Sequence, residues 1–506
     1  MSINYKIIRK AFLFIILAEL LSIFSWLLPS FGSGAFFIIL ILALILSLHK
    51  LEYGLYVLLA ELFIGSHGYL FSFSGISIRI ALFLIVMAVW LVKTLKPLNP
   101  LKSLKEYKYF WLLGIVVAWA FVWGMIRGNG FGAVFLDFNN WLYFLLILPI
   151  FSVGTGRDLS AQKFRQNILS LLIVCTAWLF IKSIILFYLF SHSLAVIMGN
   201  TYRWARDTRV GEITSVAPGI YRVFLQSQIY ALISFFILLP ISNFPASPAG
   251  RQFLISNKIQ NKKLLNPYSL LLIPFLATII ISFSRSYWVG LVAGLFIYLI
   301  LLIIQKTRAL DILRKFAKVL IIGITSLAVL FLVLYLPPRV PGDFFNFLST
   351  RITSSEAASS SRLNQLKPLA VAIAKHPLIG SGFGTSVTYK SDDPRVVPTT
   401  AGGTGEFTTY AFEWGYLDMA LKFGLAGLIV YLLFIYQILK RLFSKQKTIN
   451  NKQEKNTYSL LLTPYSLRTG FGLALIALLV VNIFSPYLNH PLGIGFIILS
   501  SLFTYD

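Results

Sequence analysis

Two kinds of side chain in this sequence could act together on a phosphorylated substrate. Three arginines, Arg285, Arg222 and Arg209, lie near the starts of strongly apolar runs. A guanidinium group offers a planar fork of donors that binds phosphate or carboxylate through paired hydrogen bonds. Glu413 and His376 carry groups that could accept the proton of an attacking hydroxyl. The five histidines are scattered without paired spacing, so we expect neither a metal site nor a cofactor.

These side chains must be positioned by membrane-spanning helices. Of the 506 residues, 57% are hydrophobic and only 12% are charged, which is too little polar surface for a soluble globule. Apolar runs of about 20 residues, long enough to cross a bilayer as helices, recur from end to end. We therefore predict an all-α, polytopic integral membrane protein with about 12–14 transmembrane helices. The candidate helices lie near 11–28, 33–48, 51–65, 77–95, 110–126, 139–153, 167–190, 220–241, 267–283, 286–304, 318–337, 411–439, 469–485 and 487–503.

Basic residues predict how these helices are oriented, because Lys and Arg near span ends stay on the cytoplasmic side. With the amino terminus inside, inner segments hold 28 of the 44 Lys and Arg residues, outer segments hold 14, and Lys182 and Lys422 lie within spans. Eleven of the 14 outer residues are Arg, whereas 20 of the 28 inner ones are Lys. This bias favours recognition of phosphate or carboxylate outside, although pairing with outer acids such as Asp207 and Glu212 would also explain it. We attribute the net charge of +26 to topology and anionic lipid, with no nucleic-acid role.

One long outer segment, Pro337 to Leu417, is predicted to form a helical cap. It divides the chain into N-terminal transmembrane helices (1–336), a large extracytoplasmic loop or cap (337–410) and C-terminal transmembrane helices (411–506). Everything else in the chain then serves to hold this segment at a membrane surface.

Within the cap, apolar residues spaced along 362–375 predict a helix that lies along the membrane interface. A proline follows His376 and ends this helix, because the residue before a proline disfavours helical geometry. Gly380, Gly382 and Gly384 then predict a turn that allows close approach of the backbone. The G-x-G-x-G pattern is weak evidence for phosphate binding, since no strand precedes it, and it also fits a simple tight turn.

The local context of each candidate leaves alternatives open. Arg285 lies in a short hinge between two spans, where it could bind a ligand or extend to lipid head groups. Glu413 could act as a general base or form an interfacial ion pair, and His376 could be structural. Asp418 and Lys422 are one helical turn apart, so we expect them to pair.

Four features together point to a known family. They are the Ser284-Arg285-Ser286 hinge that opens a span; an Arg before a span in the preceding outer loop (Arg222 or Arg209); Arg362 followed by the run His376-Pro377-Leu378-Ile379-Gly380-Ser381-Gly382-Phe383-Gly384; and Glu413-x-x-Tyr416-Leu417 with Gly424-Leu425-Ala426-Gly427 downstream. Over roughly residues 200–440 the chain resembles the bacterial O-antigen ligase and O-antigen polymerase superfamily.

This resemblance implies a metal-independent glycosyltransferase that uses an undecaprenyl-diphosphate-linked oligosaccharide and a glycan, lipid or protein acceptor. Glu413 stands where the ligases often have His, a departure that shifts weight from ligation towards polymerisation or another acceptor. The implied roles are catalysis for Glu413 and His376, diphosphate binding for Arg285, Arg222 and Arg209, and substrate or cap contacts for Arg362, Tyr416, Gly380 and Gly382. We expect a multi-pass protein of the bacterial inner membrane with an extracytoplasmic active site.

Two other classes of function fit the composition. A transporter or flippase of lipid-linked saccharides would also have a dozen or so helices with charged residues in its spans. Such proteins commonly show repeated halves with broken helices at the midplane, whereas this sequence shows no internal repeat and its polar candidates gather at the outer surface. A non-catalytic partner in an envelope assembly is the third class.

Overall fold

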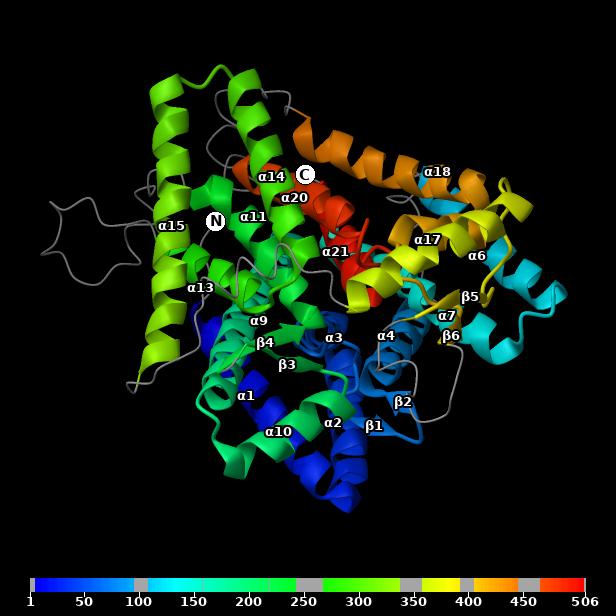
Figure 1. The fold of residues 1–506 in the computed structure, drawn as a ribbon, viewed down its shortest axis with the longest axis horizontal. Helices are drawn as coiled ribbons and strands as arrows, with labels where there is room; N and C mark the ends of the chain where they lie inside the picture. Colours follow the sequence, from blue (N-terminus) through cyan, green and yellow to red (C-terminus); the bar gives the residue numbers. More distant parts are fainter. Residues whose placement is uncertain are drawn as a thin grey trace, which may run out of the picture.

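A computed structural model describes residues 5–94, 108–156, 158–217, 219–242, 267–336, 357–391, 405–444 and 465–504, and these are predominantly helical (Figure 1). The first half contains α1 (Tyr5–Leu27), α2 (Pro29–His49), α3 (Leu51–Ile64), α4 (Ile78–Thr94), α6 (Lys108–Ile126), α7 (Phe131–Leu142), η1 (Tyr143–Leu146), α8 (Ile147–Gly154), α9 (Leu159–Ser191), α10 (Ala195–Asp207), η2 (Gln226–Gln228) and α11 (Ile229–Ser242). The second half contains α13 (Pro267–Ile281), α14 (Arg285–Ile304), α15 (Ala309–Tyr335), α17 (Ala357–Lys375), α18 (Gly415–Phe443), α20 (Tyr465–Val481) and α21 (Pro491–Leu502).

The predicted membrane helices are present. Within the described ranges, eight helical segments are long and apolar enough to cross a bilayer, and four shorter apolar helices accompany them. With α3 and α4, these account for each of the fourteen predicted spans. Several starts differ from the prediction. The largest differences are in four spans where helical structure begins earlier, at Tyr5 (α1), Phe131 (α7), Leu159 (α9) and Ala309 (α15). The eighth span begins with a strand, because Ile220–Leu225 pairs with a neighbour.

The core lies around α11, α20 and α21. Every residue of α11 from Ile229 to Leu239 is buried, as is every residue of α21, so these helices are surrounded by protein rather than lipid. In contrast, α1, α2, α14 and α15 expose rows of large apolar side chains. Such side chains suit contact with lipid, where there is no hydrophobic penalty for exposure.

Contacts between loops show which connections lie at the same end of the helix bundle. At one end, which we call the cap end, contacts join the α6–α7 connection to the cap, β4 to the α13–α14 hinge, and η2 to the α20–α21 connection. At the opposite end, Lys318 bonds to Ser242 and Lys93 to Ser47. Helices that cross and return produce this alternation, which agrees with the predicted order of inner and outer loops.

Three small antiparallel hairpins were not predicted: β1 (Ser72–Phe73) with β2 (Ile76–Ser77), β3 (Gly211–Ala217) with β4 (Ile220–Leu225), and β5 (Val387–Lys390) with β6 (Glu406–Thr409). In β4, Ile220, Val223 and Leu225 are buried, while Arg222 is only partly buried. The β3–β4 register sets Arg222 opposite Thr214. The hairpin therefore presents the Arg222 guanidinium at the cap end.

The glycine-rich run of the cap is built into the helix bundle. Helix α18 is broken at Gly424, whose φ of 71° is left-handed. Ser381 N donates to Leu421 O (2.7 Å) and Gly382 N to Lys422 O (3.1 Å), while Leu425 N donates to Pro377 O (2.8 Å). A helix break frees carbonyl and amide groups that need partners inside a membrane. The 377–384 segment supplies those partners, so we call it the cap clamp.

Close backbone contacts explain the glycines of the cap clamp. A Cβ on Gly380 would lie 2.4 Å from Lys422 O, and one on Gly382 would lie 2.4 Å from the amide nitrogen of Gly124 on α6. Both residues also have positive φ angles, 73° and 83°. Only glycine meets both requirements at little cost. In Figure 1 the cap helix α17 lies beside α18, one of the two helices that the clamp joins.

A buried charge network lies next to the cap clamp. The expected pair is present, with Lys422 Nζ 2.6 Å from Asp418 Oδ1, and Asp137 of α7 joins it at 2.7 Å. Asp137 also accepts from Gly384 N (3.1 Å), and Asp418 accepts from Asn489 Nδ2 (2.6 Å). The network thus ties the clamp to α7, α18 and the α20–α21 connection.

Candidate active site

The segment from Asn482 to His490, between α20 and α21, lies at the centre of the cap end, and we call it the central turn. Tyr487 OH donates to Gln226 O (3.1 Å), and Ser485 Oγ donates to Ser286 Oγ (3.1 Å). The central turn therefore contacts η2 after β4 and the first turn of α14 simultaneously. Its position makes it the support of the site.

Arg285 is the last residue of the hinge, residues 282–285, and Arg222 contacts the first. Arg285 is the first residue of α14 and is exposed. Arg222 donates from Nε to Ser282 O (2.9 Å), and its guanidinium lies 4.8 Å from the ring centroid of Phe224. Phe283, between them, adopts a left-handed φ of 45°. The hinge therefore carries one of the three arginines expected to bind diphosphate and is contacted by a second.

Two tyrosines couple this hinge to the central turn. The hydroxyls of Tyr287 and Tyr487 are hydrogen-bonded to each other, and Tyr287 OH also contacts Gln226 O at 3.4 Å. Both tyrosines are buried, so their hydroxyls depend on these partners. The pair fixes the orientation of the first turn of α14, and with it the direction of Arg285.

Arg209 lies apart from the other two arginines. It follows α10 and immediately precedes the hairpin end where Gly211 pairs with Leu225, whereas Arg222 lies farther along the hairpin. Its guanidinium carbon is 4.8 Å from the centroid of Tyr69. The three candidate arginines thus form two groups rather than one.

Glu413 and Arg362 form an ion pair, with exposed side-chain fractions of 47% and 42%. Trp414 Nε1 donates to the backbone carbonyl of Arg362 (2.8 Å), which holds the start of α18 against α17. The Trp414 ring also packs against Phe484 of the central turn, with centroids 5.6 Å apart. Glu413 therefore borders the central turn, one residue from the ring that contacts it.

His376 lies away from Glu413. Its Nε2 is 2.7 Å from Arg127 Nη1, and because guanidinium only donates, Nε2 accepts and the ring proton of the neutral imidazole is on Nδ1. The accepting nitrogen is thus already used by Arg127. This contact favours a structural role for His376. Glu413 is also engaged, in the ion pair with Arg362, which is one of the two alternatives that the sequence left open for it.

The other predicted contact residues have mainly structural partners. Tyr416 OH donates to Leu479 O (2.8 Å), which joins α18 to α20. The amides of Gly380 and Gly382 donate to His376 O and Lys422 O, so they are engaged within the protein. Asp207, one of the outer acids, pairs with Arg206 at 3.0 Å. Pairing with acids therefore explains part of the outer arginine bias.

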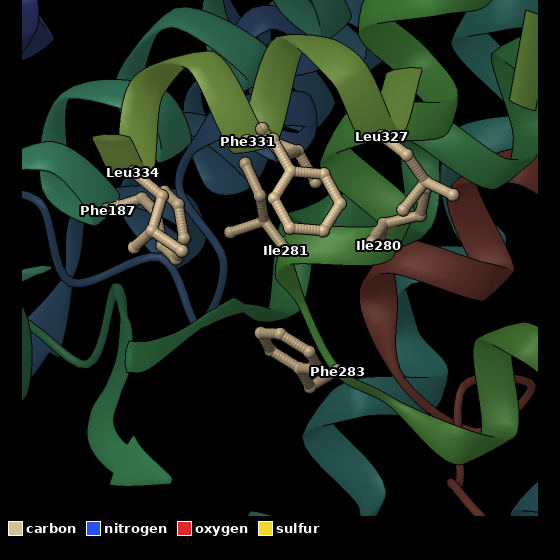
Figure 2. Close-up of a pocket in the computed structure, with 8 residues that line it drawn as sticks. Phe187, Ile280, Ile281, Phe283, Leu327, Phe331 and Leu334 are labelled. Atoms are coloured by element: carbon tan, nitrogen blue, oxygen red, sulfur yellow. The ribbon is translucent and has the colours of Figure 1, made fainter. Parts of the chain in front are cut away.

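An apolar hollow opens next to the hinge, between α9, α13 and α15. Figure 2 shows Phe283 at one side of it, with Phe187 from α9 and Phe331 and Leu334 from α15 at the other. Ile280 and Ile281, the last residues of α13, also line it. The hinge residue Phe283 is therefore shared by the hollow and by the backbone segment that carries Arg285.

Several residues of this end were not singled out from the sequence. The central turn was interpreted only as a break between two spans, yet Asn482, Ser485, Tyr487, Asn489 and His490 fall within nine residues there. This concentration of polar groups between two apolar helices was a usable signal. In contrast, nothing in the spacing linked Asp137 to Lys422, which are 285 positions apart. No group of three or more metal-binding side chains occurs among the described residues.

The described residues define a polytopic, predominantly helical membrane protein in which the hinge next to Arg222 and Arg285 adjoins an apolar hollow. The family model described as O-antigen ligase matches residues 270–432, from α13 to the second half of α18, so this region is similar to the O-antigen ligase family. The match confirms the resemblance to the ligase and polymerase superfamily and indicates an enzyme that transfers glycosyl groups. It includes Arg285, Arg362, His376 and Glu413, whereas Arg222, Arg209 and the central turn lie outside it. No curated protein matches the chain significantly.

Proposed function

We propose that this protein is a glycosyltransferase that takes an undecaprenyl-diphosphate-linked oligosaccharide and transfers or polymerises its glycan onto an acceptor hydroxyl. The observation that supports this most is the hinge of residues 282–285. Arg285 ends the hinge, Arg222 contacts its first residue, and Phe283 within it lines the apolar hollow. A prenyl diphosphate is an apolar chain with an anionic end. The apolar side chains around the hollow suit contact with the surface of the chain, and the two arginines suit the diphosphate.

In the proposed reaction, the acceptor oxygen forms a bond to the anomeric carbon while the bond from that carbon to the diphosphate oxygen breaks. The diphosphate leaves with the bonding electrons and gains negative charge. Guanidinium groups already in place stabilise that charge more in the transition state than in the ground state. Glu413 accepts the hydroxyl proton, and Arg362 orients the Glu413 carboxylate through their ion pair.

The proposed setting is the bacterial inner membrane, with the cap end on the extracytoplasmic face. The basis is the excess of Lys and Arg in the loops of the opposite end. Lipid-linked glycans presented on that face would reach the hinge from the side, because the hollow is formed by the membrane helices α9, α13 and α15.

Purified protein in nanodiscs, supplied with lipid-linked oligosaccharide from the host membrane, tests this proposal by mass spectrometry of the glycan product. Arg285→Ala should lower the turnover rate by about 10²–10³ and Glu413→Gln by about 10²–10⁴. Glu406→Gln on β6 and Arg314→Gln at the opposite end are matched controls, because both side chains are exposed. Product formation at the control rate by both site variants would refute the assignment.

One observation favours transport as a second candidate, since α18 is a broken helix beside buried charges. However, the groups freed at the break are already bonded to the cap clamp. Movement of lipid-linked saccharide across vesicles containing the purified protein, with no new glycosidic bond, would favour the transporter.

A further inference from the structure

A second cationic cluster lies at the cap end, and the proposed donor site does not use it. It comprises Arg209, Tyr69, His67, His490 and Tyr410, which we call the Arg209 cluster. The Arg209 guanidinium lies 4.8 Å from the Tyr69 ring, and the rings of His67 and His490 meet edge to face at 5.6 Å. These residues come from the α3–β1 loop, the α10–β3 connection, the central turn and the β6–α18 connection, so the fold gathers them.

Members of the cluster have shifted pKa values. Burial, with help from Arg79 and Arg209, lowers the pKa of His67 to about 4, although part of its side chain reaches solvent. Burial and Asp137 raise the pKa of Tyr410, while Lys422 and Arg209 oppose that shift. At neutral pH the cluster therefore presents neutral imidazole and phenol groups around the Arg209 charge.

Within the described part of the chain, Arg209 has no carboxylate at salt-bridge distance. Arg79 nearby is paired with Glu61 at 2.8 Å, and Asp137 is paired with Lys422 at 2.7 Å. A contact with an aromatic face holds a guanidinium in place but leaves its N–H donors unoccupied. A carboxylate partner would instead occupy those donors. The exposed Arg209 side chain thus keeps its donors for a ligand.

Backbone geometry sets where the two loops that carry the cluster begin. Arg209 adopts a left-handed φ of 52°, and Ser66, next to His67, adopts one of 51°. Each residue lies just past the end of a helix, α10 or α3, where a left-handed residue commonly closes the last turn. The two helix ends therefore fix the starting points of the loops that carry Arg209 and His67.

The Arg209 cluster and the donor site approach different parts of the central turn. Tyr487 contacts the Tyr287 side, where Arg222 and Arg285 lie, whereas His490 contacts His67. His490 Nδ1 accepts from Leu492 N (3.3 Å), so the proton of its neutral ring is on Nε2 and can be donated. A transferase needs two substrates beside one reaction centre, and the central turn separates two sites.

We propose that the Arg209 cluster is the acceptor subsite and that it takes a saccharide bearing a phosphate or carboxylate group, a proposal that rests on the glycosyltransferase function. Arg209 binds the anionic group through its fork of donors. Tyr69 and Tyr410 offer flat surfaces to the sugar ring, and the imidazoles offer hydrogen bonds to its hydroxyls.

The test is binding to the purified full-length protein in nanodiscs, with galactose 1-phosphate as the acidic saccharide and galactose as its neutral counterpart. Farnesyl diphosphate at saturation occupies the donor site during the titration. Arg209→Gln should weaken galactose 1-phosphate binding by about tenfold or more, because it removes charge-assisted hydrogen bonds. Tyr69→Leu should weaken both sugars, and the matched control Arg203→Gln on α10 should change binding by less than about twofold.

The proposal is overturned if Arg209→Gln behaves like Arg203→Gln in the sugar titration. It is also overturned if, in a separate titration with farnesyl diphosphate alone, Arg209→Gln weakens binding as much as Arg222→Gln does. The second result would make Arg209 part of the donor site. Because this readout needs no turnover, it is separate from the transfer assay. If Arg209→Gln loses galactose 1-phosphate binding while the native protein forms no glycosidic bond, the glycosyltransferase function is refuted and the saccharide-binding site remains.

Discussion

Replacing Lys422 with methionine tests whether the buried charge network holds the cap end together. In the native protein one ammonium group compensates two carboxylates, with Asp418 at 2.6 Å and Asp137 at 2.7 Å, and the three side chains are at most 9% exposed. Lys422→Met keeps most of the side-chain volume but leaves both carboxylates buried without a cation. Breaking a buried pair by removing one partner costs about 3–5 kcal/mol.

The matched variant is Asp418→Asn, which leaves the Lys422–Asp137 pair intact. An asparagine there can accept from Lys422 through its carbonyl oxygen, and Asn489 can reverse its amide to remain bonded. Its cost should stay near the roughly 1 kcal/mol of an ordinary hydrogen-bond change. The two substitutions therefore differ in charge balance, although both touch the same network.

The assay is thermal unfolding of the purified protein in one detergent, followed by tryptophan fluorescence. Because the entropy of unfolding grows with chain length, a protein of 506 residues should shift by about 1 °C for each kcal/mol. Lys422→Met should therefore lower the midpoint by roughly 3–5 °C, and Asp418→Asn by about 1 °C. Adding Asp137→Asn and Asp418→Asn to Lys422→Met should recover much of the loss, since no buried charge then remains in the network. Equal midpoints for Lys422→Met and the wild type, or equal losses for both single variants, would refute the reasoning.

Three further predictions concern neighbouring features. Gly382→Ala should destabilise the cap clamp and increase protease cleavage there, because the new Cβ would lie 2.4 Å from Gly124 N at a φ of 83°. Gly75→Ala is the control, since Gly75 has a similar φ of 82° but open space around its Cβ position. Equal cleavage of the two variants would contradict the packing argument. Asn129→Ala should cost about 1–3 kcal/mol, because its side chain donates to Ser381 O and Phe383 O; an unchanged unfolding midpoint would show that the clamp does not need this contact. His67→Asn should remove part of the acid sensitivity of unfolding. The pKa of His67 is about 4 in the folded protein, against an ordinary value of 6.5. The stability that neutral His67 contributes is therefore complete above pH 6.5 and is lost as the pH falls towards 4. Midpoints at pH 7 and pH 5 measure it, and identical pH dependence in wild type and variant would count against it.

Hydropathy and charge located the helices because each span needs an apolar run of nearly fixed length. The hinge at Arg285 and the pair Asp418–Lys422 were also predictable, since they depend on neighbours within a few positions. The hairpin that carries Arg222 was missed because Ile220–Leu225 is apolar enough to be taken for the start of the next helix. The alternation of buried and partly buried residues in this strand covers only six positions, so it gives a weak strand signal.

The composition of the site was harder to predict than the fold. Arg209 and Arg222 are only 13 positions apart, yet the β3–β4 hairpin directs them to different partners, Tyr69 and Ser282. Likewise, Glu61 and Arg79, or Glu19 and Lys182, pair across helices whose packing no local spacing determines. Long-range contacts of this kind depend on helix packing, so a single sequence does not specify them directly.

The cap clamp limits how the glycan substrates can arrive. Because the 377–384 segment is bonded into the gap in α18 and held against α6, the C-terminal part of the cap cannot swing away like a hinged cover without breaking membrane-embedded backbone hydrogen bonds. In the proposed reaction, a lipid carrier would therefore enter between membrane helices rather than by movement of this part of the cap.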